Sequence, residues 1–240
     1  MKRVLAQTRV ELALTLRRGE SVLLSLGIPV LLLVFFSVVD VLPTGTDDPV
    51  DFLAPGVLAL AVMSTAMVGL GIATGFERQY GVLKRLGSTP LGRPALLAAK
   101  TLAILAVEVL QVAVLAGVAL ALGWRPDGSV VAFVPAMLLA TVAFAGLGLL
   151  MAGALRAEAT LAVANGAYLL LLVLGGMAYP LSKLPQAVQD IARVLPAAPL
   201  AECLRSALTG AGIPGARLAI LIGWAVITPL LAARSFRWEE

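Results

Sequence analysis

The chain has 240 residues, of which 60% are hydrophobic and 13% are charged, and its mean hydropathy is +0.99. Because soluble domains carry about 25% charged residues, this composition excludes an ordinary soluble protein and indicates an all-α integral membrane protein. The sequence has no histidine and a single cysteine, which excludes imidazole metal sites, Ser-His and Cys-His nucleophile pairs and a disulfide within the chain.

Residues 1–20 are expected to form a helix that lies along the inner membrane interface. On a helical projection one stripe is largely apolar and the opposite face is basic, as in interfacial helices. The stripe holds Val4, Leu5, Thr8, Leu12 and Leu16, and the basic face holds Lys2, Arg3, Arg17 and Arg18. A basic flank that only fixes the topology is the alternative. No small-residue cleavage site follows, which favours an uncleaved first span over a secretory signal.

Six stretches are apolar and long enough to cross a membrane, since a spanning helix needs about 20 residues. They cover residues 21–41, 53–75, 98–122, 130–154, 159–179 and 216–233. Glycines in the second and fourth stretches predict faces on which helices approach closely, namely Gly71, Gly75, Gly146, Gly148 and Gly153. The sequence therefore predicts one transmembrane domain over residues 1–240 with six spanning helices.

The lysines and arginines indicate the orientation of the spans, because cytoplasmic loops carry an excess of them. With the N-terminus inside, thirteen of the 18 basic residues fall in cytoplasmic segments and five in outer segments. The net charge of +4 is thus explained by topology, and because the basic residues are not interleaved with aromatic ones, no nucleic-acid partner is expected. We expect a multi-pass membrane protein with both termini in the cytoplasm.

The cytoplasmic segment 76–94 between the second and third spans is unusually polar. Phe76, Tyr80 and Leu83 fall at helical spacing, Gly87 can end a helix and Pro90 prevents its continuation. This pattern predicts a single short amphipathic helix with a firm end. Because a simple connector needs only a few residues, the segment is interpreted as a docking surface. A helix that rests on lipid without a protein partner is the alternative.

Glu108 is the one acidic residue well inside a predicted span, where a carboxylate costs about 2.5–3.5 kcal/mol on insertion scales. Gln111 lies on the same helical face, so the two polar side chains could line a cavity or pair with another helix. A proton-coupled carrier would use such a carboxylate as its proton site. A structural carboxyl group, hydrogen-bonded between helices, is the competing interpretation.

The outer segment 180–217 contains five prolines and is too interrupted for a span. Val188, Ile191 and Leu195 make one short apolar face, and Leu200, Leu204 and Leu208 make a second. We therefore expect two short helices here, either interfacial or re-entrant, on the outer side of the membrane.

Two motifs bear on enzymatic activity. Asp47, Asp48 and Asp51 superficially match an Asp-rich metal–diphosphate motif, but Pro49 interrupts a helix there and no second carboxylate cluster exists, so a membrane-embedded prenyl transferase is the least favoured class. The chain also lacks the Gly-rich phosphate loop that binds ATP. No catalytic residue, metal site or cofactor is expected in this chain.

The sequence resembles the permease subunits of type-2 ATP-binding-cassette exporters over nearly its whole length. The resemblance is carried by LAPGVLALAVMSTAM at Leu53–Met67, ERQYGVLKRLGSTPLGRPALLAAK at Glu77–Lys100, GGMAYPLSKLP at Gly175–Pro185 and IARVLPAAPLAECLRSAL at Ile191–Leu208. The order and spacing of these motifs are more specific than any one of them.

This resemblance implies a dimer of permeases, either two copies or two close paralogues, each docked on a separate ATPase that binds ATP and Mg²⁺. The coupling helix maps onto Glu77, Arg78, Gly81, Lys84, Arg85 and Leu86. Residues 184–208 would cover the exit, and the substrate would pass near the second and fifth spans. Candidate pathway residues are Glu108, Gln111, Asn165, Tyr168 and Met177. The expected substrate is a hydrophobic or amphiphilic drug, lipid or natural product, and the composition suggests a bacterial cell membrane.

Overall fold

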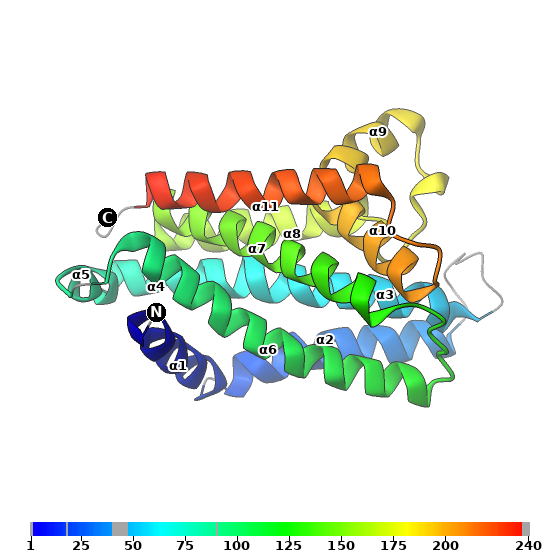
Figure 1. Ribbon diagram of the computed structural model, residues 1–240, viewed down its shortest axis with the longest axis horizontal. Helices are drawn as coiled ribbons and strands as arrows, with labels where there is room; N and C mark the ends of the chain where they lie inside the picture. Colours follow the sequence, from blue (N-terminus) through cyan, green and yellow to red (C-terminus); the bar gives the residue numbers. More distant parts are fainter. Residues whose placement is uncertain (1, 18, 40–47, 90, 237–240) are drawn as a thin grey trace.

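The computed structural model describes residues 2–17, 19–39, 48–89 and 91–236, and within these ranges the protein is built from helices without strands (Figure 1). The all-α prediction is therefore confirmed. The elements in chain order are α1 (Lys2–Arg17), α2 (Gly19–Val38), α3 (Pro49–Val62), the π-helix η1 (Met63–Gly69), α4 (Leu70–Gln79), α5 (Val82–Gly87), α6 (Arg93–Ala121), α7 (Val130–Ala154), α8 (Ala157–Leu174), the 3₁₀ turn η2 (Leu181–Lys183), α9 (Gln186–Val194), α10 (Ala197–Leu208) and α11 (Gly215–Ser235).

Five helical segments of the described chain are long and apolar enough to cross a membrane. They are Pro49–Gln79, Arg93–Ala121, Val131–Ala154, Ala157–Leu174 and Gly215–Ser235. The first of these joins α3, η1 and α4 into one continuous helix of 31 residues, longer at both ends than the predicted stretch 53–75. The remaining predicted span corresponds to α2, in which the described apolar part, Ser25–Val38, is shorter than a full span. The count of six spans thus stays a prediction.

The long helices lie roughly along one direction, and the two ends of the bundle differ in character (Figure 1). One end carries α1, α5 and the last turn of α11, and the opposite end carries α9 and α10. The segment 76–94 therefore lies at the same end as α1 and the end of α11, as the charge pattern predicts for cytoplasmic segments. Asp47 lies outside the described residues, and Pro49 begins α3 rather than interrupting a helix.

Close backbone approaches hold the centre of the bundle together. A Cβ atom on Gly71 would lie 3.1 Å from the Gly148 carbonyl oxygen, and one on Gly146 would lie 2.3 Å from the Thr228 hydroxyl oxygen. Side chains larger than hydrogen would push α4 and α11 away from α7 at these crossings. The glycine faces predicted in the second and fourth spans therefore are contact faces, as in other membrane helix pairs.

Helix α1 forms as predicted, but its contact face differs from the predicted apolar stripe. Leu5 and Leu16 remain about half exposed, whereas Glu11 is buried against α6. The physical reason is that α1 packs on the bundle through a polar contact centred on Glu11. The apolar side chains that stay exposed suit the membrane interface.

The prediction of one capped amphipathic helix in segment 76–94 is wrong. Phe76 to Gln79 belong to the end of α4, and a separate helix, α5, begins at Val82. The break lies at Gly81, whose φ of 70° is left-handed and incompatible with a continuous helix. The predicted end at Gly87 is confirmed, and Pro90 falls in a gap of the described chain.

The segment 180–217 forms two short helices, as predicted, and they are α9 and α10. Helix α10 packs against α3, α7 and α11, and Leu200 and Leu204 are fully buried in that contact. Helix α9 is more peripheral, because Ile191 and Val194 keep about three-fifths of their surface exposed. The two helices therefore play different roles, with α10 a part of the core and α9 a partly exposed cover.

Candidate functional site

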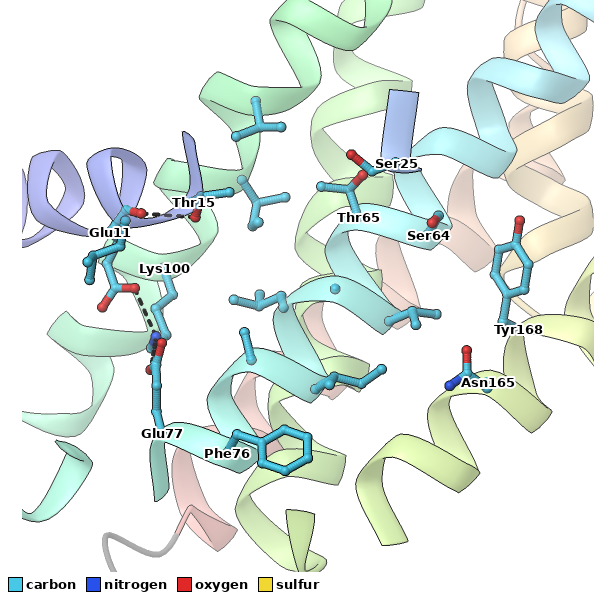
Figure 2. A pocket seen from close by; sticks show the side chains of 18 of the residues that line it. Glu11, Thr15, Ser25, Ser64, Thr65, Phe76, Glu77, Lys100, Asn165 and Tyr168 are labelled. Atoms are coloured by element: carbon cyan, nitrogen blue, oxygen red, sulfur yellow. Dashed lines mark hydrogen bonds and ion pairs between the residues drawn. The ribbon is translucent and has the colours of Figure 1, made fainter. Parts of the chain in front are cut away.

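A cavity of about 850 Å³ is formed by α1, α2, η1, α4, α6 and α8. It lies along the face of the continuous helix Pro49–Gln79 from Ser64 to Glu77, toward the end of the bundle that carries α5, and it is also lined by Tyr80 just after that helix. Figure 2 shows α1 and Lys100 on one side of this helix and α8, with Asn165 and Tyr168, on the other. The cavity thus has two polar walls that face each other across an apolar helix surface.

The π-helix η1 shapes the middle of the cavity. Seven residues, Met63–Gly69, take the wider i→i+5 turn inside an otherwise α-helical span, and four of them face the cavity: Ser64, Thr65, Val68 and Gly69. Such interruptions occur often at functional sites, since they re-aim side chains without ending the helix. The pattern of apolar residues in the sequence does not distinguish such a π-helical turn from the α-helix around it.

Gln111 of α6 holds η1 in place. Its amide nitrogen donates to the Thr65 hydroxyl over 2.8 Å and to the Ser25 backbone carbonyl over 3.1 Å. One buried side chain therefore connects α6 to η1 and α2, and both of its acceptors belong to residues that line the cavity. Gln111 itself lies behind this wall, which makes it a positioning residue.

One polar wall is a buried ion-pair cluster. The Lys100 ammonium lies 2.9 Å from a Glu11 carboxylate oxygen and 2.6 Å from a Glu77 carboxylate oxygen, and only 1% of the Lys100 side chain is exposed. The Gln7 amide donates a further hydrogen bond of 2.8 Å to Glu11. Because removing one partner of a buried pair leaves an uncompensated charge, this cluster fastens α1, α4 and α6 to one another.

The opposite wall is provided by α8. Asn165 and Tyr168 both line the cavity, and the Asn165 amide donates to the Leu161 carbonyl over 2.8 Å within its own helix. Figure 2 shows both side chains on the α8 side, facing η1 and α4. Two of the five predicted pathway residues, one turn apart on the fifth predicted span, are thus brought to the cavity.

Glu108 and Met177 lie elsewhere. The Glu108 carboxyl is buried between α6 and α7 in a hydrogen bond with the Thr141 hydroxyl, and it does not line the cavity. Met177 is fully buried in the turn after α8, and its carbonyl oxygen lies so close to Gly56 that a Cβ on Gly56 would be only 2.0 Å away. Glu108 was predicted as a pathway residue for its polarity and Met177 for its position in a motif. Neither property reveals which way a side chain points.

The predicted coupling residues divide into two groups. Lys84 and Arg85 are exposed on α5, and Gly81 and Leu86 are half-buried. Glu77 instead turns inward to Lys100, and Arg78 is buried and donates to the Leu155 carbonyl at the end of α7. Glu77 and Arg78 therefore do not lie on an open surface, because α4 continues past the predicted end of the span and keeps them against the bundle.

Lys100 and Glu11 are site residues that the span and motif patterns did not predict, although a signal was present. Glu11 is the one acidic residue of Lys2–Arg17, and Lys100 lies among apolar residues just inside α6. An acidic residue on a basic helix and a lysine among the apolar residues of a span indicate a pair, since an unpaired charge within a span is costly.

A third basic residue, the half-buried Arg205, organises the end of the bundle that carries α9 and α10. The Arg205 guanidinium donates to the Gly176 carbonyl over 2.6 Å and lies 3.9 Å from the centre of the Phe52 ring. Burial lowers the pKa of Arg205 to about 10, so it remains charged at neutral pH. The cation therefore ties α10 to α3 and to the turn after α8. Among the described residues, no cluster of three or more Cys, Asp or Glu could hold a metal ion.

The apolar helices define a multi-pass membrane protein with a cavity among its spans. Residues 3–209 match the family model of the ABC-2 type transporter membrane domain, and the chain belongs to this family of transporter permeases. No curated protein matches the chain.

Proposed function

We propose that the protein is the permease subunit of an exporter that moves a hydrophobic or amphiphilic substrate out of the cytoplasm. The observation that carries this proposal is the match to the ABC-2 permease family over residues 3–209, together with a largely apolar cavity between Pro49–Gln79 and α8. A separate ATPase subunit would bind ATP and Mg²⁺ and supply the energy. The excess of basic residues at the α5 end supports a cytoplasmic location of that end in a bacterial cell membrane.

Helix α5 and the turn before it form the proposed ATPase-docking surface. Tyr80 is 71% exposed and Val82 is 40% exposed, and both lie beside the exposed cations Lys84 and Arg85. Exposed apolar groups next to charges are typical of a docking site. Because α5 follows α4 directly, a shift of α5 would be passed to the helix that lines the cavity, which is a mechanical route for alternating access.

Charge reversal at Lys84 and Arg85 tests this docking surface. The double variant K84E/R85E is expected to weaken assembly with the ATPase subunit by about tenfold or more, since like charges across an interface cost several kcal/mol. Co-purification and ATP-driven transport in vesicles would measure the effect. Both side chains are exposed, and exposed charge pairs contribute little to stability, so the unfolding temperature should change little.

The matched control is Lys183→Glu, an exposed cation at the opposite end of the bundle. It should leave both assembly and transport intact. Normal assembly and transport by K84E/R85E would refute docking at α5. Neither Glu77 nor Arg78 suits this experiment, because their substitution would disturb internal contacts.

The second partner in the proposal is another copy of the permease, or a close paralogue, that packs against α8. Only 22% of the residues of this helix are buried within the chain, and the exposed Asn165 in its middle lies at the border of the cavity. An exposed amide in a spanning helix is better accommodated against a neighbouring helix than against lipid. A dimer on α8 would also close the cavity on the side that this helix borders.

A proton-coupled carrier that uses Glu108 as its proton site is the alternative to the ATP-driven exporter, and the two differ in what they predict for Glu108→Gln. Because Glu108 does not line the cavity and its hydrogen bond to Thr141 can also form with an amide, Glu108→Gln is expected to retain ATP-driven transport at close to the original rate. Transport assays in vesicles with and without an uncoupler would measure this. Uncoupler-sensitive transport that Glu108→Gln abolishes would favour the carrier instead.

A further inference from the structure

The cavity carries an excess of negative charge at its α1 wall. Glu11 and Glu77 supply two carboxylates there, and Lys100 is the one cation among the described residues that line the cavity. The three side chains together leave one uncompensated negative charge. In a site with low-dielectric walls such a charge acts more strongly than it would in water.

This negative charge remains accessible from the cavity. Lys100 is sequestered, with 1% of its side chain exposed, but Glu11 and Glu77 keep 10% and 14% of their side-chain surface. The second oxygen of Glu77 is not contacted by Lys100, and the second oxygen of Glu11 accepts only from the neutral Gln7 amide. A ligand in the cavity would therefore meet carboxylate oxygens before it met the ammonium group.

The groups beside the carboxylates favour a cation with an apolar body. Phe76 and Tyr80 stack with their ring centres 6.1 Å apart, before and after Glu77 in the chain, and both line the cavity. Aromatic faces attract cations, and Phe76 is the more enclosed of the two rings, since Tyr80 is 71% exposed. The helix surface between the two polar walls presents Val68, Ile72 and Ala73, which suit an apolar body.

The α8 wall offers neutral hydrogen-bonding groups and no charge. Asn165 and Tyr168 lie there, and Figure 2 shows them across the cavity from Glu11 and Lys100. A ligand that spans the cavity would thus have its positive group at the α1 wall and a neutral or polar group at α8. An anionic amphiphile would meet the uncompensated carboxylate charge at one wall and find no cation at the other.

We propose that this cavity binds amphiphilic cations and rejects anions of the same size and shape. This inference deepens the proposed export function, on which it rests for its biological meaning, by assigning the charge class of the substrate. Its physical basis is the two accessible carboxylates that outnumber the one sequestered ammonium.

The test uses two probes of nearly identical shape and opposite charge, tetraphenylphosphonium and tetraphenylborate. Equilibrium dialysis against the purified full chain in a non-ionic detergent, corrected with protein-free micelles, would give both dissociation constants. We expect the cation to bind about tenfold or more tightly than the anion, which corresponds to about 1.4 kcal/mol. The assay needs no ATPase, so it succeeds or fails independently of docking at α5.

Three variants locate the binding site. Glu77→Gln removes the excess charge while keeping the shape, and should reduce cation affinity about tenfold and abolish most of the preference. Glu11→Gln should act in the same direction and serves as a second variant if Glu77→Gln folds poorly. Ala73→Leu narrows the cavity and should weaken both probes. Asp190→Asn, an exposed carboxylate on α9, is the matched control and should change neither.

The outcomes separate clearly. Selective cation binding that Glu77→Gln or Glu11→Gln reduces in a folded protein, and that Ala73→Leu also reduces, would support the proposal. Equal affinity for the two probes, a preference for the borate, no binding of either probe, or cation binding that Ala73→Leu leaves unchanged would each overturn it. Equal binding of both probes would indicate an apolar site suited to lipid chains instead.

Discussion

Replacement of Lys100 by methionine is expected to destabilise the protein by about 3–5 kcal/mol, the range for removal of one partner from a buried ion pair. The ammonium is 1% exposed and is the hydrogen-bond donor to both Glu11 and Glu77. Without it, two carboxylates of like charge, with only 10% and 14% of their side-chain surface exposed, would face each other without a cation between them. The Glu11 and Glu77 carboxylates would then repel each other, and the ion pairs that join α1 and α4 to α6 would be lost.

Unfolding of the purified chain in detergent, followed by circular dichroism against temperature and denaturant, would measure this loss. Lys183→Met removes an exposed lysine at the other end of the bundle and should leave the transition unchanged. The combined variant K100M/E11Q/E77Q should recover most of the stability, because it removes the charges together. Lys100→Met as stable as the original chain would show that the ion pairs contribute nothing to folding.

The sequence predicted the helical elements well because their signals are local. Apolar length marked the spans, Gly87 marked the end of α5, and the spacing of Leu200 and Leu204 marked the buried face of α10. Charge asymmetry predicted that segment 76–94 lies at the same end as α1, and the structure places it there. Each of these features depends either on residues that are close together in the chain or on the number of charged residues in a segment.

The site was predicted less completely because it depends on which way side chains turn and on contacts between distant segments. Residues 11, 77 and 100 meet only after α1 folds across α6, so sequence spacing could not pair them. Glu77 was predicted to be a surface residue because the predicted span ended at residue 75, whereas α4 continues to Gln79 and the helix breaks only at Gly81. Asn165 and Tyr168 do line the cavity, and they were chosen because the resemblance to a family indicated their helix; their part in a substrate pathway stays a prediction.

The other large effect is expected at Gly148, where α7 crosses η1. A Cβ on Gly148 would lie 2.5 Å from the Met67 carbonyl oxygen and 3.0 Å from that of Ala66, and these are backbone atoms that cannot turn aside. Gly148→Ala should therefore force the helices apart and cost about 1–3 kcal/mol, the usual range for overpacking a tight contact. The cavity should change as well, since Val68 and Gly69 of η1 line it.

The same substitution at Gly117 separates this effect from helix propensity. Gly117 lies in the interior of α6, and no neighbouring atom comes within 4 Å of the place that a Cβ would take, so Gly117→Ala meets open space. Alanine raises helix propensity at both sites by up to about 1 kcal/mol, and that gain should appear undiminished only at Gly117. Unfolding temperatures of the two variants should thus move in opposite directions. Equal stabilisation of both would mean that α7 and η1 are not in the close contact described, because only a wider separation leaves room for the added methyl group.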